Sequence, residues 1–95
     1  MLILEQSDRF KEELQSVVNF IAIDSPSRAL DFFDDIVLKI ETIPENPYIF
    51  RKRQSLDDNI RELIFKGYTV PFFIDKQNNK IIVLGIFNQN IWEVD

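Results

Sequence analysis

The chain has 95 residues, 45% of them hydrophobic, and a net charge of −5 at neutral pH. It contains no cysteine and no histidine, which excludes zinc sites of the usual Cys/His kind, cysteine nucleophiles and Ser-His-Asp triads. Acid–base chemistry would need Asp, Glu, Lys or Tyr with a shifted pKa, and the acidic charge argues against a protein that surrounds nucleic acid.

The length predicts a single domain over residues 1–95, because 95 residues suffice for one hydrophobic core. The longest uninterrupted apolar run is far below the ~20 residues that a membrane-spanning helix needs. Residues 1–5 lack the basic region and long apolar stretch of a signal peptide. We therefore expect a cytoplasmic protein without a membrane partner.

The first half of the chain predicts a short strand followed by two helices. Leu2–Glu5 is the expected strand, and Ser7 is the expected N-cap of the first helix. Ser25 and Pro26 predict the start of a second helix, because proline is well tolerated in the first turn. Apolar residues recur every three or four positions in both helices, at Phe10, Leu14, Val17, Val18 and Ile21, and then at Ala29/Leu30, Phe33, Ile36/Val37, Ile40 and Ile43, with Phe32 beside the second stripe.

The two predicted helices are joined by a turn of a few residues and should form an antiparallel hairpin. Pro44 and Pro47 end the second helix, and an irregular stretch follows up to Asn59. Three carboxylates lie on one side of this helix, at Asp31, Asp34 and Asp35. They could hold a metal ion, but without histidine or a fourth converging ligand we interpret them as a solvated helix face.

The last third of the chain predicts three consecutive strands. The first begins at Ile60 and ends at Lys66-Gly67, where glycine permits a tight reversal. The second, Tyr68–Ile74, ends at the polar residues 75–80, which are typical of a hairpin loop. The third, Ile81–Phe87, is apolar without a break, as expected of a strand buried on both faces.

These elements predict an α+β fold in the order β-α-α-β-β-β, with the helical hairpin packed on one face of an antiparallel sheet. Each half buries the apolar face of the other. Pro71 lies in the middle of the second meander strand and has no amide hydrogen to donate. It predicts either a bulge at that point or an unpaired side of the strand.

A basic cluster, Arg51-Lys52-Arg53 together with Arg61, is the best candidate for a binding surface. Residues 51–68 contain five basic and three acidic residues, a net +2, whereas the rest of the chain carries −7. The cluster either contacts an acidic or nucleic-acid-bound target or forms a solvated loop that pairs with nearby aspartates, Asp57 and Asp58.

Trp92 stands in a polar tail after the last predicted strand. It either folds back onto the domain as a lid or serves as an exposed anchor for a partner, since tryptophan is enriched at interface hot spots.

Three segments carry a family resemblance: Ile60-Arg61-Glu62-Leu63, then Gly67-Tyr68-Thr69-Val70-Pro71-Phe72, then the strand closing in Ile86-Phe87-Asn88-Gln89. Together they resemble the ParE/RelE superfamily of bacterial toxins, the poison halves of type II toxin–antitoxin pairs. The stretch Tyr68–Phe72 is most similar to the ParE branch. The order of elements extends this resemblance over nearly the whole chain, whereas the motifs cover about a third of it.

The resemblance to ParE implies a non-catalytic inhibitor that binds DNA gyrase and is neutralised by a cognate antitoxin protein. No cofactor and no direct contact with nucleic acid are expected. Ribonuclease members of the superfamily use Lys, Arg, Tyr and sometimes Glu or His. Here Thr69 stands where they tend to have Arg, and Asn88 and Asn90 stand where they have His, Arg or Tyr. Amides cannot exchange protons usefully or neutralise a phosphorane-like transition state.

Two alternatives stay open beside the gyrase inhibitor. A RelE-like endoribonuclease, cutting mRNA on the ribosome, would use Arg61, Lys66 and the loop cations for phosphate contacts and Tyr68 or Glu62 for proton transfer. A degenerate family member would bind its antitoxin and poison nothing. In the favoured interpretation no residue is catalytic or ligates a metal, and the target-binding residues are Arg51, Lys52, Arg53, Arg61 and Trp92.

Overall fold

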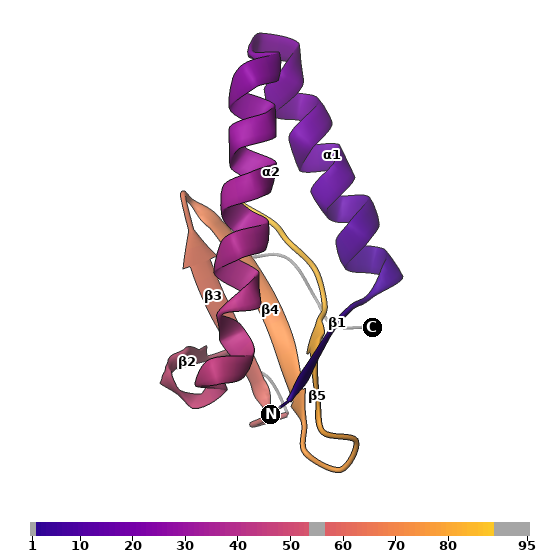
Figure 1. The fold of residues 1–95 in the computed structure, drawn as a ribbon, viewed down its shortest axis with the longest axis vertical. Coiled ribbons are helices and arrows are strands. Elements are labelled where there is room, and N and C mark those ends of the chain that lie inside the picture. The colour runs from indigo at the N-terminus through magenta and orange to yellow at the C-terminus, as the bar shows by residue number, and fades with distance from the viewer. Residues whose placement is uncertain (1, 54–56, 89–95) are drawn as a thin grey trace.

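The structure, a computed structural model, describes residues 2–53 and 57–88. Two helices pack against one face of a five-stranded sheet (Figure 1), and the predicted α+β class and element order are confirmed. Within the described residues, no helix has the length and hydrophobicity needed to span a membrane. The elements are β1 Ile3–Gln6, α1 Asp8–Asp24, α2 Pro26–Glu41, β2 Arg51–Lys52, β3 Ile60–Phe65, β4 Tyr68–Asp75 and β5 Lys80–Val83.

The sheet has the strand order β1-β5-β4-β3-β2. Strand β1 runs parallel to β5, whereas all other neighbours are antiparallel, so the sheet is mixed rather than purely antiparallel. The additional strand, β2, lies in the stretch that was expected to be irregular. It extends the meander at the edge opposite β1.

Both predicted helix caps are confirmed. The Ser7 hydroxyl oxygen accepts a hydrogen bond from the Phe10 amide at 3.1 Å, and Ser25 accepts one from the Arg28 amide at 3.3 Å. These caps satisfy amides that have no partner within the helix. After α2, two short 3-10 turns, Ile43–Glu45 and Pro47–Ile49, carry the chain from the helices to the sheet edge.

The predicted apolar stripe of α2 includes Leu30 and Phe33, which are exposed, and omits Phe32, which is buried. Phe32 is only 6% exposed, and its ring lies 5.3 Å from that of Tyr68, so it belongs to the core. Phe33 and Leu30 are instead 42% and 66% exposed. The residues buried in α2, Ala29, Phe32, Ile36 and Ile40, still recur every three or four positions, but their face is centred on Ile36, which turns Leu30 away from the sheet.

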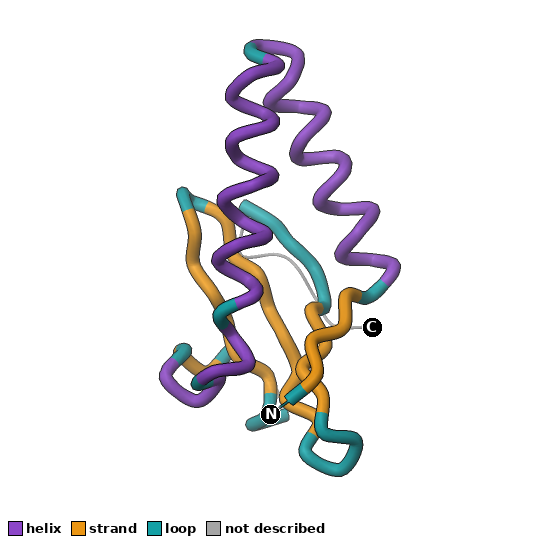
Figure 2. The backbone as a smooth tube through the Cα atoms, viewed as in Figure 1, coloured by secondary structure: helices purple, strands orange, loops and turns teal. Residues whose placement is uncertain are grey.

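The two helices lie over one face of the sheet (Figure 2), and the buried residues of the core come from the helices and from β3, β4 and β5. Phe72 lies within it on β4 and is completely buried, with the Phe50 ring edge-on at 5.5 Å. The largest contributions come from both helices and all three strands, including Phe10, Ile36, Ile40, Leu63, Val70, Phe72, Ile74, Ile81 and Val83.

The turn between β3 and β4 is the predicted tight reversal. Lys66 and Gly67 are its two central residues, with φ angles of +48° and +84°. Positive φ at both positions matches the right-handed twist of the flanking strands, and glycine adopts it without steric cost.

The irregularity predicted at Pro71 is present, and the extra residue lies in the facing segment. Thr69 pairs with Phe87, and Phe72 pairs with Val83, so two residues of β4 face the three residues 84–86. The Leu84 amide donates to the Pro71 carbonyl oxygen at 2.9 Å, but proline has no amide hydrogen to return. Strand β5 therefore ends at Val83, and the predicted strand up to Phe87 is too long.

The prediction that the last strand is buried on both faces is also wrong. Ile81 and Val83, which face the helices, are completely buried, whereas Ile82 between them is half-buried. The helices cover only one face of the sheet, and this alternation is the consequence.

The loop between β4 and β5 allows a prediction about pH. The Asp75 carboxylate accepts hydrogen bonds from the Asn78 side-chain amide at 2.8 Å and from its backbone amide at 3.2 Å, and these lower the pKa of Asp75 below its ordinary 3.8. Because the pKa is lowered on folding, the stabilisation is present above the ordinary pKa and is lost as pH falls through the lowered value.

We expect Asn78→Ala to raise the pKa of Asp75 towards its ordinary value. An NMR titration of the side-chain carboxyl carbon in both proteins measures it directly. An unchanged pKa in the variant would show that the Asn78 amide is not the main cause.

Candidate functional site

The four basic residues of the predicted binding surface lie at the β2–β3 edge of the sheet. They are Arg51, Lys52, Arg53 and Arg61. In the antiparallel register Arg51 faces Glu62, and Lys52 faces Arg61. Because successive side chains of a strand point to opposite faces, Arg51 and Glu62 share one face, and Lys52 and Arg61 share the other. The basic residues therefore do not form one continuous patch.

Arg51 and Arg53 both bind Glu62. The Arg51 Nε lies 3.0 Å from Glu62 Oε1, and Arg53 Nη1 donates to Oε2. The Arg53 guanidinium also lies over the Phe87 ring, 5.1 Å from its centroid. We call these four residues, Arg51, Arg53, Glu62 and Phe87, the Glu62 cluster.

The members of the Glu62 cluster differ in exposure. The Glu62 side chain is 7% exposed and that of Arg53 15%, whereas the Arg51 side chain is 62% exposed. Two guanidinium groups against one carboxylate leave a net charge of +1. Arg53 is thus fixed between a carboxylate and an aromatic ring, and Arg51 carries the charge that an approaching molecule can reach.

Arg61 has a structural role on the helix-facing side. Its Nη1 donates to the carbonyl oxygens of Tyr48 at 3.1 Å and Phe50 at 2.9 Å, and its guanidinium lies 5.2 Å from the centroid of the Tyr48 ring. Its Nε is buried without a hydrogen-bond partner in the described part of the chain. Arg61 therefore ties the segment before β2 to the sheet.

Two predicted target-binding residues remain, Lys52 and Trp92. Lys52 is exposed on β2, next to Arg51. Trp92 lies outside residues 2–53 and 57–88. The target-binding role assigned to Arg51, Lys52, Arg53, Arg61 and Trp92 stays a prediction, and Arg51 and Lys52 are the described members with the most exposed charge.

The residues suggested for the ribonuclease alternative are divided between two places: Tyr68 and Lys66 line one cavity, and Glu62 binds the loop arginines elsewhere. Tyr68 pairs with Phe65 and lies on the helix-facing side of the sheet against Phe32, whereas Glu62 points to the opposite face. A cavity of about 450 Å³ beside Tyr68 is lined by Ile21, Arg28, Asp31, Phe32, Asp35, Lys66 and Tyr68.

The cations of this cavity are paired with carboxylates. The Lys66 Nζ lies 3.3 Å from Asp35 Oδ2, and Arg28 binds Asp24 one turn earlier. In residues 2–53 and 57–88, no group of three or more acidic, histidine or cysteine side chains is placed to hold a metal ion. The two cations that line the cavity, Lys66 and Arg28, are therefore neutralised by carboxylates.

Sequence reasoning missed the roles of Glu62 and Phe87. One signal for Glu62 was available, because Arg51 and Arg53 stand two positions apart, which puts both on one face of an extended segment. A carboxylate within an apolar strand is the partner that such a pair requires. Phe87 ends the strand that is predicted to be buried on both faces, whereas its ring lies against Arg53 on the face turned away from the helices.

Comparisons with known proteins give the family of the chain and solved structures with a similar fold. The model of one family, the ParE toxin of the type II toxin–antitoxin system parDE, matches residues 4–91. Among solved structures, the chain is similar to one from the chromosomal ParDE toxin–antitoxin system of P. aeruginosa, with a TM-score of 0.74 and 20% identity over 90% of this chain and 94% of that one.

A second solved structure, the conserved hypothetical protein HP0892 from Helicobacter pylori, is similar with a TM-score of 0.55 and 19% identity, over 94% of this chain and 96% of that one. At such identities these two structures show the shared fold alone. No curated protein matches the chain.

Proposed function

Because this chain belongs to the ParE toxin family of type II toxin–antitoxin systems, we propose that it is a toxin that inhibits DNA gyrase by binding and is neutralised by a cognate antitoxin. The family match over residues 4–91 carries the proposal.

Inhibition by binding is favoured over cleavage because the chain does not assemble a phosphodiester-cleaving centre from its described residues. A general acid and base must lie within hydrogen-bond reach of the reacting atoms. Tyr68 and Glu62 lie on opposite faces of the sheet. Glu62 is in addition bound by two guanidinium groups, which hold it as a structural anion.

The target contact is assigned to Arg51 and Lys52. Both side chains are exposed at the β2 edge, on opposite faces of the sheet, and they belong to a locally basic segment of an otherwise acidic protein. Charges at such an edge accelerate association and select an acidic partner surface more than they add affinity. The binding should therefore weaken with increasing salt.

We expect the double substitution Arg51→Ala with Lys52→Ala to raise the concentration that halves gyrase supercoiling by roughly tenfold, since two exposed charges contribute together about 1–1.5 kcal/mol. A titration of purified protein into a supercoiling reaction measures this. The control, Lys11→Ala with Lys39→Ala, removes the same charge from exposed helix positions and should retain inhibition. Equal weakening by both pairs would show that net charge, not the β2 edge, matters.

We propose that the antitoxin binds to the helical hairpin. Phe20 and Ile23 of α1 are 70% and 84% exposed, and Leu30 of α2 is 66% exposed. A groove of about 380 Å³ runs between α1 and the segment after β5, and Phe20, Tyr68 and Ile86 line it. An amphipathic segment of a partner laid across these residues would bury the exposed apolar surface.

Expression of the chain alone in a bacterial host tests the proposal. Growth arrest with loss of negative supercoiling of plasmid DNA, relieved by coexpression of the protein from the adjacent reading frame, supports it. Codon-positioned cleavage in toeprints of translating ribosomes would replace it with the ribonuclease alternative. Normal growth would favour the degenerate family member.

A further inference from the structure

A second group of cations surrounds Tyr48 on the helix-facing side of the sheet. The Arg61 guanidinium carbon lies 5.2 Å from the centroid of the Tyr48 ring, and the Lys76 Nζ, from the loop between β4 and β5, lies 5.4 Å from it. Lys52 faces Arg61 in the β2–β3 register. We call Tyr48, Lys52, Arg61 and Lys76 the Tyr48 site.

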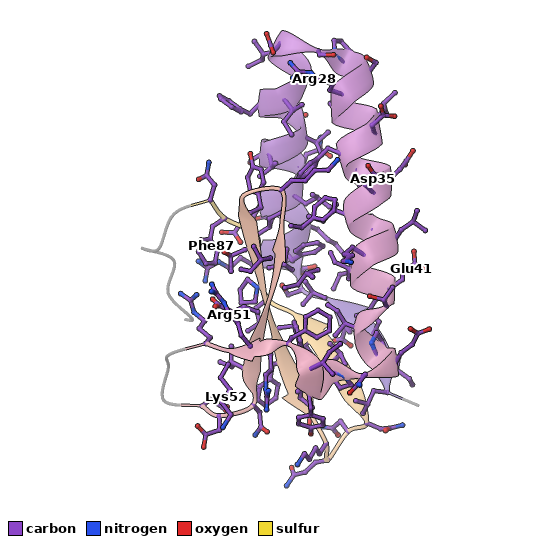
Figure 3. All side chains as sticks on the ribbon, turned by 90° about the vertical axis from the view of Figure 1, so that its left-hand side faces the viewer. Arg28, Asp35, Glu41, Arg51, Lys52 and Phe87 are labelled. Carbon is purple, nitrogen blue, oxygen red and sulfur yellow. The ribbon has the colours of Figure 1, made fainter. Side chains whose placement is uncertain are left out.

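The Tyr48 site is separate from the Glu62 cluster. Figure 3 shows Arg51 and Lys52 on opposite sides of the β2 ribbon, as the alternation of side chains along a strand requires. Glu62 therefore binds cations of the other face and leaves those of the Tyr48 site uncompensated.

The three cations of the Tyr48 site have no ion-pair partner among residues 2–53 and 57–88. The carboxylate next to Lys76 in the sequence, that of Asp75, accepts hydrogen bonds from Asn78 instead. Lys52 and Arg61 stand directly opposite each other, an arrangement of like charges that destabilises a strand pair. The site thus holds three positive charges on a chain whose net charge is −5.

Arg61 is the fixed centre of the site. Its Nη1 donates to the carbonyl oxygens of Tyr48 and Phe50, which holds the guanidinium group in place before any partner arrives. Its Nε is buried and has no acceptor within the described residues. Partial burial of a cation without an anion is costly, so a carboxylate placed beside Arg61 would compensate a charge that the described fold leaves unpaired.

Exposed apolar side chains adjoin these charges. Tyr48 is 44% exposed, and Ile49, which follows it in the second 3-10 turn, is 70% exposed. Stacked bases of a nucleic acid need a free aromatic face, and two cations already lie beside the Tyr48 ring. Exposed apolar groups next to three cations therefore fit a protein segment better than a nucleic acid.

We propose that the Tyr48 site binds an acidic segment of a partner protein, an extended stretch in which carboxylates stand near an apolar side chain. Alternate residues of an extended segment lie about 6.6 Å apart on one face. Arg61 and Lys76 both lie within 5.4 Å of one ring centroid, so two such carboxylates can meet both cations. A long polyanion is disfavoured, because the chain outside residues 51–68 carries −7.

The site extends the proposed target contact, with which it shares Lys52. It rests on the proposed function only for the identity of the partner. It also divides the roles of the two exposed cations of β2, because Lys52 acts together with Lys76 whereas Arg51 belongs to the Glu62 cluster.

Fluorescence anisotropy of a labelled peptide tests the proposal without gyrase. The probe is a fluorescein-labelled peptide in which glutamate alternates with serine around one central leucine, and its control has glutamine in place of glutamate. At low salt we expect the native protein to bind the acidic probe about tenfold more tightly than the glutamine control. Equal binding of the two peptides overturns the proposal.

Two variants locate the contact. Lys52→Ala with Lys76→Ala should weaken binding of the acidic probe about tenfold, because two exposed charges are lost. Lys11→Ala with Lys39→Ala removes the same charge from the helices and should change binding less than about twofold. All four positions are exposed, so both proteins should fold, which circular dichroism checks. Equal weakening by the two pairs overturns the site.

Two further outcomes would identify a different occupant. A single-stranded oligonucleotide of the same charge that binds more tightly than the acidic peptide, and loses this binding in Lys52→Ala with Lys76→Ala, overturns the proposal in favour of phosphate. Sedimentation of the native protein as a dimer that the same double substitution dissociates overturns it in favour of a second copy.

The failures of the two proposals are distinguishable. The peptide titration contains no gyrase, so absence of peptide binding overturns the Tyr48 site and leaves the supercoiling result untouched. Gyrase inhibition that fails while the acidic peptide binds overturns the proposed function and supports the site.

Discussion

Phe72→Ala is expected to lower the free energy of unfolding by about 4 kcal/mol, the largest effect of any single truncation that we predict. Phe72 is completely buried on β4, between the helices and its neighbours on β3 and β5. Removing its ring forfeits the transfer free energy, leaves a cavity, and removes the edge-on contact with Phe50 at 5.5 Å. Since domains of this size have a total stability of about 5–10 kcal/mol, most of it would be lost.

Equilibrium urea unfolding followed by circular dichroism measures this change. Phe33→Ala is the matched control, because the same group is removed from a position that is 42% exposed on α2, and we expect a cost of about 1 kcal/mol. Equal costs for the two variants would contradict the packing described above. They would also reopen the choice between Phe32 and Phe33 as the buried residue of α2.

Glu62→Ala is expected to lower the free energy of unfolding by about 3 kcal/mol. The carboxylate is 7% exposed, and its loss leaves the Arg53 guanidinium, 15% exposed, without the anion that compensates its removal from water. Arg51, at 62% exposure, can be rehydrated, so Arg51→Ala should cost much less.

The exposed pair of Glu5 and Lys80 provides the comparison for Glu62. Their charged atoms lie 3.3 Å apart, with side chains 49% and 38% exposed, and Glu5→Ala should cost about 0.5 kcal/mol or less. Urea unfolding of both variants under the same conditions gives the difference. If Glu62→Ala costs no more than Glu5→Ala, Glu62 is not the anion that holds the β2–β3 edge.

The parts of the fold that depend on neighbouring residues could be predicted from the sequence. The caps at Ser7 and Ser25 are local, because each hydroxyl accepts a hydrogen bond from the amide three residues later and no distant residue is involved. The Lys66-Gly67 turn is equally local. The order of elements followed, because a helical hairpin and a three-stranded meander are each incomplete without the other.

The parts that depend on distant contacts could not be predicted. Whether Phe32 or Phe33 is buried depends on the rotation of α2 over β3 and β4, because adjacent helix positions differ by only about 100°. The direction of β1 is set by its pairing with β5, which follows it by more than seventy residues. Strand β2 has two residues, too few for any periodicity.

The candidate site shows the same division. The charge of residues 51–61 predicted the location of the site. It did not predict which face of the sheet each cation would occupy. That assignment depends on the register in which Arg51 meets Glu62 and Lys52 meets Arg61. A shift of one residue would move each cation of β2 to the opposite face of the sheet.

Supercoiling by purified DNA gyrase in the presence of the purified protein tests the central claim most directly. We predict inhibition at micromolar protein, without cleavage of RNA on ribosomes, and its reversal by the cognate antitoxin. Full supercoiling activity at that concentration would contradict a gyrase-binding toxin and leave the fold without its proposed target.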